Sequence, residues 1–291
     1  MNNKLLECYS VYIDIGRGDW LIPSGQIKRT NEKYILDFLN FWGKIEAKLT
    51  LFCEEYFIDI IKKAIDDFKE INGFFKSEVG FQTFERNDLF YFKEIETIRR
   101  IQSSENMIKY SARDKSGPPE YTNAEWVAIM LSKPIIIKMA KDRKLIDPES
   151  KVIAWADFGI AHCGHNHEYS NFLNGKRLIE PTEDKITFFN KRNFLPDKNP
   201  WVNNRLEDDV FTPGGFYLLP VNMIDEFNTK FHEIVKDDFF KSDIVDDDQH
   251  IMAIFSAKYP EISRLENSYK YANNPSEADF FPVFYTTENI Q

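Results

Sequence analysis

The sequence predicts an α/β fold in which a mostly parallel sheet is flanked by helices. Short apolar runs rich in β-formers alternate with longer amphipathic stretches along much of the 291-residue chain, which is the pattern of such folds. The clearest unit is a helix-like stretch at 126–144 followed by a strand-like run at 152–155, which breaks at the carboxylate of Asp157. In open α/β sheets ligands bind outside the carboxyl ends of the strands. Asp157 is therefore the first residue that we place in a site.

The first half of the chain predicts further strands and helices before the 152–155 run. The strands are expected at 5–15, 49–53 and 80–84, and the helical stretches at 30–45, 54–71, 89–110 and 126–144. Thr30 or Asn31 should cap the first helix and Thr122 or Asn123 the last, because their side-chain oxygens accept hydrogen bonds from backbone amides. Pro134 should kink or divide the last helix. The apolar face expected for the second helix consists of Phe57, Ile60, Ile61, Ile65 and Phe68.

The second half adds a strand, an extended segment with glycines and two helices. We expect the strand at 186–189, the extended segment at 208–219, an amphipathic helix at 222–236 and a helix that starts within 243–257. Gly214 and Gly215 interrupt the extended segment, where glycine lets a backbone approach a ligand closely or form a bulge. We expect the tail from residue 269 to be a C-terminal segment that wraps around the domain.

Composition and charge exclude some classes of protein. The formal net charge of −10 and the isoelectric point near 5.2 argue against a nucleic-acid binder, which would carry a basic face. Three cysteines at wide spacing do not suggest a disulfide framework. Neither a signal peptide nor an apolar run long enough to span a bilayer is visible in the sequence. We expect a cytoplasmic protein with one domain.

Three interpretations compete for the segment 151–167. The first is an ordinary core strand that ends in a solvated aspartate. The second is a protein kinase, because the string Asp157-Phe158-Gly159 also occurs in kinases. The catalytic loop, the glycine-rich phosphate loop and the Ala-Pro-Glu motif of a kinase are, however, absent from the sequence. The third is zinc, although structural zinc sites usually need two ligand pairs separated by a longer loop. The zinc ligands would come from His162, Cys163, His165 and His167.

Two cationic side chains stand where a phosphate could bind. Arg17 lies in the glycine turn at 16–19 after the first strand, where it suits a nucleotide or simply solvates a loop. Lys133 precedes Pro134 in its helix. It could reach a phosphate from there, or lie on the surface as most lysines do. The residues alone leave both pairs of alternatives open.

Three consecutive aspartates, Asp246, Asp247 and Asp248, mark the start of the last expected helix. Acids at a helix N-terminus are stabilised by the helix dipole, yet three in a row exceed what a cap needs. Successive residues of a helix point about 100° apart, so the three cannot all face one cleft. We expect one aspartate to cap the helix, one to be solvated and one to take part in chemistry.

Several of these motifs together resemble a known family. The strings YIDIGRGDW, VIAWADFGI and GGFY and the pair Ser132-Lys133 are similar to those of the HtrL/YibB family of bacterial proteins, also called WlaTC-like, and the match spreads over residues 5–249. The order of parts is similar to that of GT-A glycosyltransferases. The resemblance implies a GT-A-like single domain over 1–291. Its nucleotide-sugar-binding half is expected at 1–160, and its acceptor-side half with a C-terminal wrap at 161–291.

The resemblance implies transfer of a sugar from a nucleotide sugar, with a UDP-sugar expected, to a lipopolysaccharide, lipooligosaccharide or capsule glycan. It is compatible with peripheral attachment to the inner face of the inner membrane. Such a transfer needs cations or amide dipoles at the leaving phosphate and a base at the acceptor hydroxyl. We expect Asp248 to be the base, with Asp247 second. The expected donor-binding residues are Tyr12, Asp14, Arg17, Lys133, Asp157, Gly214 and Gly215.

The expected metal site departs from the GT-A pattern. These enzymes commonly hold Mn²⁺ or Mg²⁺ with an Asp-x-Asp motif, but Trp155 and Gly159 stand two positions from Asp157. A single carboxylate is a poor site for a hard cation, which prefers several oxygen ligands. Either His250 or an acid near Asp247 joins Asp157, or the enzyme is metal-independent.

Two functions from other classes stay open. One is a non-catalytic protein that binds a nucleotide or a sugar. The other is a scaffold protein of a glycan assembly cluster, suggested by the aromatic and basic tract at 185–194. Donor affinity without transfer would favour the first, and absence of nucleotide binding would favour the second.

Overall fold

The fold is an α/β arrangement built on a mixed sheet. The computed structural model describes residues 5–16, 30–111, 123–160, 181–190, 195–199, 201 and 214–267. Hydrogen bonding orders its seven strands as β3-β2-β1-β4-β6-β5-β7. The pairs β1/β2, β1/β4, β2/β3 and β5/β7 are parallel, and β5/β6 is antiparallel. The predicted fold class, a mixed and mostly parallel sheet with helices, is confirmed.

The described residues fall into two compact units. The first contains 5–16, 30–84 and 154–160, and the second contains 85–111, 123–153, 181–190, 195–199, 201 and 214–267. Strand β4, Val152–Ala156, gives its first two residues to the second unit and the others to the first. The functional division into halves at 1–160 and 161–291 stays a prediction.

The first unit contains a parallel sheet with β1 in its interior. Its strands are β1 at Leu6–Tyr12, β2 at Ala47–Cys53, β3 at Glu78–Thr83 and the end of β4. β1 pairs with β2 along its full length and is buried at every residue. A strand covered on both faces is mostly apolar. Its carboxylate, Glu7, accepts a hydrogen bond from the Tyr9 hydroxyl at 2.5 Å.

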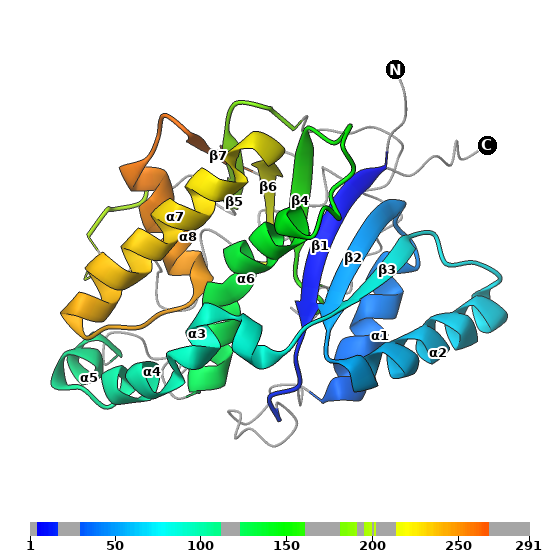
Figure 1. Ribbon diagram of the computed structural model, residues 1–291, viewed down its shortest axis with the longest axis horizontal. Coiled ribbons are helices and arrows are strands. Elements are labelled where there is room, and N and C mark those ends of the chain that lie inside the picture. The colour runs from blue at the N-terminus through cyan, green and yellow to red at the C-terminus, as the bar shows by residue number, and fades with distance from the viewer. Residues whose placement is uncertain are drawn as a thin grey trace. The chain divides into compact units, whose positions relative to one another are not determined.

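Two helices connect the first three strands of this unit. They are α1, Asn31–Trp42, and α2, Glu55–Asn72, and Figure 1 shows them next to each other. Thr30 caps α1, because its hydroxyl accepts a hydrogen bond from the Lys33 amide at 3.3 Å. This is one of the two caps that the sequence allowed.

The apolar face of α2 is narrower than the sequence predicted. Its buried residues are Phe57, Ile61 and Ile65, which follow one another at a spacing of four. Ile60 was expected on the same face, but it is 46% exposed. The expectation for Ile60 is wrong because its side chain points about 100° away from that of Ile61.

The strand order of the first unit reverses beside β1. The chain runs from β1 outward to β2 and β3, and β4 then lies on the other side of β1. Parallel strands direct their carboxyl ends to the same edge, and doubly wound sheets bind ligands outside that edge where the order reverses. The residues that follow β1 and β4 therefore lie where a ligand is expected.

Helices make up much of the second unit. A 3₁₀ turn at Arg86–Asp88 leads into the short helices α3 at Phe90–Lys93, α4 at Ile95–Gln102 and α5 at Glu105–Ser111. The helical stretch predicted at 89–110 is thus divided into short pieces. Figure 1 shows α3 and α4 beside α6, Ala124–Asp142, against which they pack.

Helix α6 runs without interruption through its proline. Asn123 caps it, because the Asn123 Oδ1 accepts a hydrogen bond from the Trp126 amide at 2.7 Å. Pro134 lies inside the helix, so the expectation that Pro134 divides it is wrong. The residues around Pro134 are mostly buried, and this packing offsets the hydrogen bond that proline removes.

The strands of the second unit surround β5. They are β5 at Ile186–Asn190, β6 at Phe216–Pro220 and β7 at Ser263–Asn267. The sequence predicts β5 and β6 but not β7. β7 has the sequence SRLEN, in which Leu265 is the single apolar residue, so it lacks the apolar run by which the other strands were found.

The last two α-helices of the described chain follow β6. A 3₁₀ turn, Val221–Met223, precedes α7 at Ile224–Glu233, and a π-helical segment, Ile234–Phe239, follows it. Helix α8 is Asp248–Lys258, and both helices were predicted. Among the helices that the structure describes, none is both long enough and apolar enough to cross a membrane.

Ile61→Ala should destabilise the first unit far more than Ile60→Ala on the same helix. Ile61 is fully buried, so truncation removes apolar contacts and leaves a cavity, at a cost of about 2–5 kcal/mol. Ile60 is 46% exposed, and its truncation should cost about 1 kcal/mol or less. Urea unfolding measures both changes in the free energy of unfolding. Equal losses would show that both side chains share one buried face.

Candidate functional site

The carboxyl edge of the parallel sheet in the first unit carries two aspartates. Asp14 follows β1 and Asp157 follows β4, and these strands are parallel neighbours. Both side chains are partly exposed. The two carboxylates therefore flank the reversal of strand order described above, where doubly wound sheets bind ligands.

A polar network holds Asp14 in place. Asn31, the first residue of α1, donates from Nδ2 to Asp14 Oδ2 at 2.9 Å and accepts from the Tyr12 hydroxyl at 2.5 Å. The other Asp14 oxygen accepts from the Gly16 amide at 2.9 Å, in a turn where Gly16 has φ 67°. The Asp14 amide donates to Glu54 Oε2 at 3.2 Å. At Gly16, where the predicted turn begins, the backbone amide thus donates to a carboxylate, and residues 17–19 lie outside the described part of the chain.

Tyr12 is 3% exposed and joins this network through its hydroxyl. Its ring lies 4.8 Å from the ring of Phe57 and 4.3 Å from that of Phe158. Phe158 in turn stacks on Phe38 at 4.6 Å. The phenylalanine of the Asp-Phe-Gly string therefore anchors the end of β4 in an aromatic core. The role of Tyr12 in donor binding stays a prediction.

Asp157 is held by the tryptophan two positions before it. The indole Nε1 of the buried Trp155 donates to Asp157 Oδ1 at 2.7 Å. The backbone carbonyl of Asp157 accepts a hydrogen bond from the Ile160 amide at 3.1 Å, and a turn begins there. Arg17 lies outside the described residues. So do the proposed zinc ligands, which are His162, Cys163, His165 and His167.

The two buried cysteines of the first unit are not poised as nucleophiles. Burial, with a further contribution from the Glu54 carboxylate, raises the pKa of the Cys53 thiol to about 12. Burial also raises the pKa of Cys8 well above its usual range. Because the thiolate is the reactive form, these two thiols are poor nucleophiles.

In the second unit, Lys133 and Asp248 form a buried ion pair. The Lys133 Nζ donates to Asp248 Oδ2 at 2.7 Å and to the Gly214 carbonyl at 3.1 Å. Both charged side chains are 1% exposed, so the alternative that Lys133 lies on the surface is wrong. Buried charges are tolerated when they are paired and hydrogen-bonded. The pair joins α6, the start of α8 and the turn before β6.

Gly214 is packed directly against this pair. A Cβ at Gly214 would overlap the Asp248 carboxylate, so the position requires glycine for steric reasons. The group that approaches Gly214 is the Asp248 carboxylate of the chain itself, whereas the sequence predicted a ligand or a bulge there. Whether Gly214 and Gly215 also contact a donor stays a prediction.

The consecutive aspartates have different partners. Asp247 caps α8, because its Oδ1 accepts from the amides of Gln249 and His250 at 3.1 and 3.3 Å. Asp248 forms the ion pair described above, and Asp246 faces the ring of His250 at 2.8 Å. All three are at most 1% exposed. The expectation that one of them is solvated is wrong, because helices α5 and α6 supply partners for Asp246 and Asp248.

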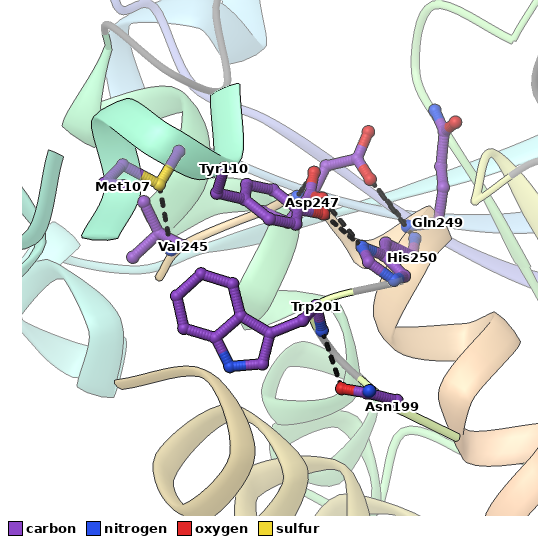
Figure 2. Close-up of polar contacts among 9 residues, drawn as sticks. Met107, Tyr110, Asn199, Trp201, Val245, Asp247, Gln249 and His250 are labelled. Carbon is purple, nitrogen blue, oxygen red and sulfur yellow. Dashed lines mark hydrogen bonds and ion pairs between the residues drawn. The ribbon is translucent and has the colours of Figure 1, made fainter. Parts of the chain in front are cut away.

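Figure 2 shows the side chains around the start of α8. The His250 Nδ1 lies 2.8 Å from Asp246 Oδ2 and 2.7 Å from the Tyr110 hydroxyl. The same hydroxyl lies 2.5 Å from the same Asp246 oxygen. The ring of Trp201 lies edge-on to that of Tyr110, with centroids 6.4 Å apart. Tyr110, Asp246 and His250 thus form a closed triangle of polar contacts.

Sequence reasoning missed this triangle. Tyr110 is 136 residues away from Asp246, and no local pattern connects them. The spacing of four between Asp246 and His250 was the available signal, since such a spacing brings side chains together at a helix start.

The described residues do not assemble a site for a divalent ion. No group of three or more His, Cys, Asp or Glu among them could hold a metal, and Trp155 donates to one oxygen of Asp157. Asp157 belongs to the first unit and His250 to the second. An ion shared by Asp157 and His250 stays a prediction.

Comparison with known proteins confirms the family that the motifs predicted. Residues 7–284 match the family described as "Bacterial protein of unknown function (HtrL_YibB)". No curated protein matches the sequence. Among solved structures, the chain is similar to the 4-diphosphocytidyl-2C-methyl-D-erythritol synthase of Anaerococcus prevotii, with 11% identity and a TM-score of 0.34 over 98% of this chain and 92% of that one. A likeness at this level carries no argument about activity.

Gly214→Ala should destabilise the second unit, whereas Gly80→Ala in β3 should be tolerated. The new Cβ at 214 would overlap the Asp248 carboxylate. The ion pair with Lys133 must then shift or break, and breaking a buried pair costs about 3–5 kcal/mol. A Cβ at Gly80 would meet the Leu49 carbonyl at 3.9 Å, which is an ordinary contact. Chemical unfolding compares the variants, and equal stability would contradict the tight packing at 214.

Proposed function

The chain belongs to the HtrL_YibB family, and from that premise we propose that it is a glycosyltransferase. In this proposal it moves a sugar from a nucleotide-sugar donor, with a UDP-sugar as the expected one, to a hydroxyl of a glycan acceptor. The observation that carries the proposal is the placement of Asp14 and Asp157 at the reversal of strand order in the first unit. Doubly wound sheets bind nucleotides at such a place.

The donor part of the proposal concerns the first unit. Carboxylates accept hydrogen bonds from hydroxyls, so Asp14 and Asp157 suit the ribose and the sugar of the donor. A diphosphate instead needs cations or N–H donors. The amides at the start of α1 and the guanidinium of Arg17 are the groups that we propose for it. Lys133 was also expected at the phosphate, but its ammonium contacts Asp248 and Gly214, which favours a structural role.

The acceptor part concerns the start of α8 in the second unit. While the bond to the leaving phosphate breaks, a base takes the proton of the attacking hydroxyl. The sequence ranks Asp248 first and Asp247 second for this role. In the structure Asp248 contacts the Lys133 ammonium and Asp247 caps the helix, so both carboxylates also hold α8 in place.

The acceptor and the place of action come from the family resemblance. It supports a lipopolysaccharide, lipooligosaccharide or capsule glycan as the acceptor, and therefore action in the cytoplasm at the inner face of the inner membrane. Mn²⁺ or Mg²⁺ is a possible cofactor, and its effect is tested by adding it to the assays below. We assign it no step, because the described residues do not assemble a site for it.

The first test of the proposal is donor binding. A ligand that binds the folded state raises its melting temperature, so nucleotide sugars at millimolar concentration should shift the thermal transition, UDP-sugars most. The screen is run with and without Mn²⁺, followed by an assay of donor consumption with glycan acceptors. A shift without transfer to any acceptor would favour a non-catalytic binding protein. No shift with any nucleotide sugar would overturn the proposal.

Asp157→Asn should lower turnover while the fold survives. The change keeps the size of the side chain and removes its charge, and a hydrogen bond to a charged group contributes about 1.5–3 kcal/mol. Turnover should therefore fall about ten- to a hundredfold. Asp66→Asn on α2, where the native side chain is 75% exposed, is the matched control and should keep the wild-type rate. If Asp157→Asn also keeps that rate, Asp157 only ends a strand.

A further inference from the structure

His250, a buried residue at the start of α8, makes its polar contacts through one ring nitrogen, Nδ1, and has a second nitrogen, Nε2, on the other side of the ring. His250 is 1% exposed, and its Nε2 makes no hydrogen bond within the described part of the chain. Its Nδ1 faces Asp246 and the Tyr110 hydroxyl. In Figure 2 the Nε2 edge of the ring points away from Tyr110.

The contacts at Nδ1 determine which ring nitrogen carries the proton. Asp246 Oδ2 lies 2.8 Å from Nδ1 and 2.5 Å from the Tyr110 hydroxyl. A carboxylate oxygen only accepts hydrogen bonds, so the lowest-energy arrangement has the Nδ1–H and the Tyr110 O–H both donating to it. The other tautomer would place a lone pair against a negative oxygen. Neutral His250 therefore has a proton on Nδ1 and a lone pair on Nε2.

A buried lone pair of this kind is a site for a hydrogen-bond donor. Buried polar groups are almost always hydrogen-bonded, so the Nε2 of His250 is suited to accept from a donor such as a hydroxyl. An imidazole whose far nitrogen donates to a carboxylate is the arrangement of a general base that removes a proton from a hydroxyl. The acceptor of a glycosyl transfer supplies such a hydroxyl.

We infer that His250 is the general base of the transfer, and that Asp246 and Tyr110 are positioning residues that hold its ring. The inference rests on the proposed function. In the step, the acceptor oxygen forms a bond to the anomeric carbon of the donor sugar while the bond from that carbon to the phosphate oxygen breaks. The acceptor proton moves to Nε2, and the leaving nucleoside diphosphate keeps the electron pair.

Asp246 compensates the positive charge that this step creates on the ring. The imidazolium keeps its Nδ1–H contact with the carboxylate and gains an attraction to it, as in the Ser-His-Asp arrangement. Tyr110 donates to the same oxygen and keeps the carboxylate in place. The step as written is a single displacement at the anomeric carbon, which inverts its configuration.

This assignment moves the base from Asp248 to His250. Side chains two positions apart on a helix point about 200° apart, so the two residues face different surroundings on α8. Asp248 faces the Lys133 ammonium. His250 contacts the Asp246 carboxylate and the Tyr110 hydroxyl.

The tautomer can be measured on the wild-type protein without a substrate. Long-range ¹⁵N–¹H correlation NMR at neutral pH should show His250 with its proton on Nδ1 and none on Nε2. In Asp246→Asn the carboxylate is lost, and a larger share of the Nε2–H tautomer should appear, which a merely structural Asp246 would not cause. A proton on Nε2 in the wild-type protein would overturn the inference.

Kinetics then test the role in transfer. His250→Gln should lower turnover at least about a hundredfold with donor affinity nearly unchanged, and Asp246→Asn and Tyr110→Phe should lower it less. His250→Ala leaves room for imidazole, and added imidazole should restore part of the lost turnover. The matched control is His232→Gln, because His232 also contacts a tyrosine hydroxyl, that of Tyr91 at 3.0 Å, and it should keep the wild-type rate.

The outcomes separate this inference from the proposed function. A wild-type protein that neither binds nor consumes any nucleotide sugar refutes the function itself. Wild-type turnover that survives in His250→Gln refutes only the base assignment, and a product with retained configuration refutes the single displacement. Loss of turnover in Asp248→Asn while His250→Gln keeps it would return the role to Asp248.

Discussion

The buried contact between Lys133 and Asp248 is the constraint on which the second unit depends. An ammonium that is 1% exposed must meet a carboxylate or be neutralised. The contact ties the middle of α6 to the first residue of α8, and the Gly214 carbonyl adds the turn before β6. A hydrophobic pair of the same volume could be as stable. We therefore regard the ion pair as a device that fixes the register of these three elements.

In the first unit the corresponding constraint is the parallel pairing of the strands. Because β1, β2 and β4 run in one direction, the residues that follow them emerge at one edge of the sheet: Asp14, Glu54 and Asp157. Tyr12 couples this edge to the core, since its ring packs on Phe158 while its hydroxyl donates to Asn31. Packing inside the unit thus sets the position of the polar groups at its edge.

Local patterns predict most of the fold and part of the site. Apolar runs locate the strands, caps locate the starts of α1 and α6, and the ends of strands point to Asp14 and Asp157. β7 is missed because a polar strand is stabilised by its distant pairing with β5 rather than by its own residues. The contact of Lys133 with Asp248 spans 115 residues of sequence. A single sequence carries no pattern that specifies such a contact, so the burial of Lys133 could not be predicted.

The contacts at the start of α8 support the inference that the histidine, rather than a neighbouring aspartate, is the base. Protonation of Asp248 would remove the negative charge that its ion pair with Lys133 requires, so each turnover would disrupt the contact that fixes the helix. Protonation of Asp247 would weaken the cap in the same way. Protonation of His250 at Nε2 leaves its Nδ1–H contact with Asp246 intact and strengthens it, because a neutral donor becomes a charged one. The fold therefore tolerates a change of charge at His250 better than at either neighbouring acid.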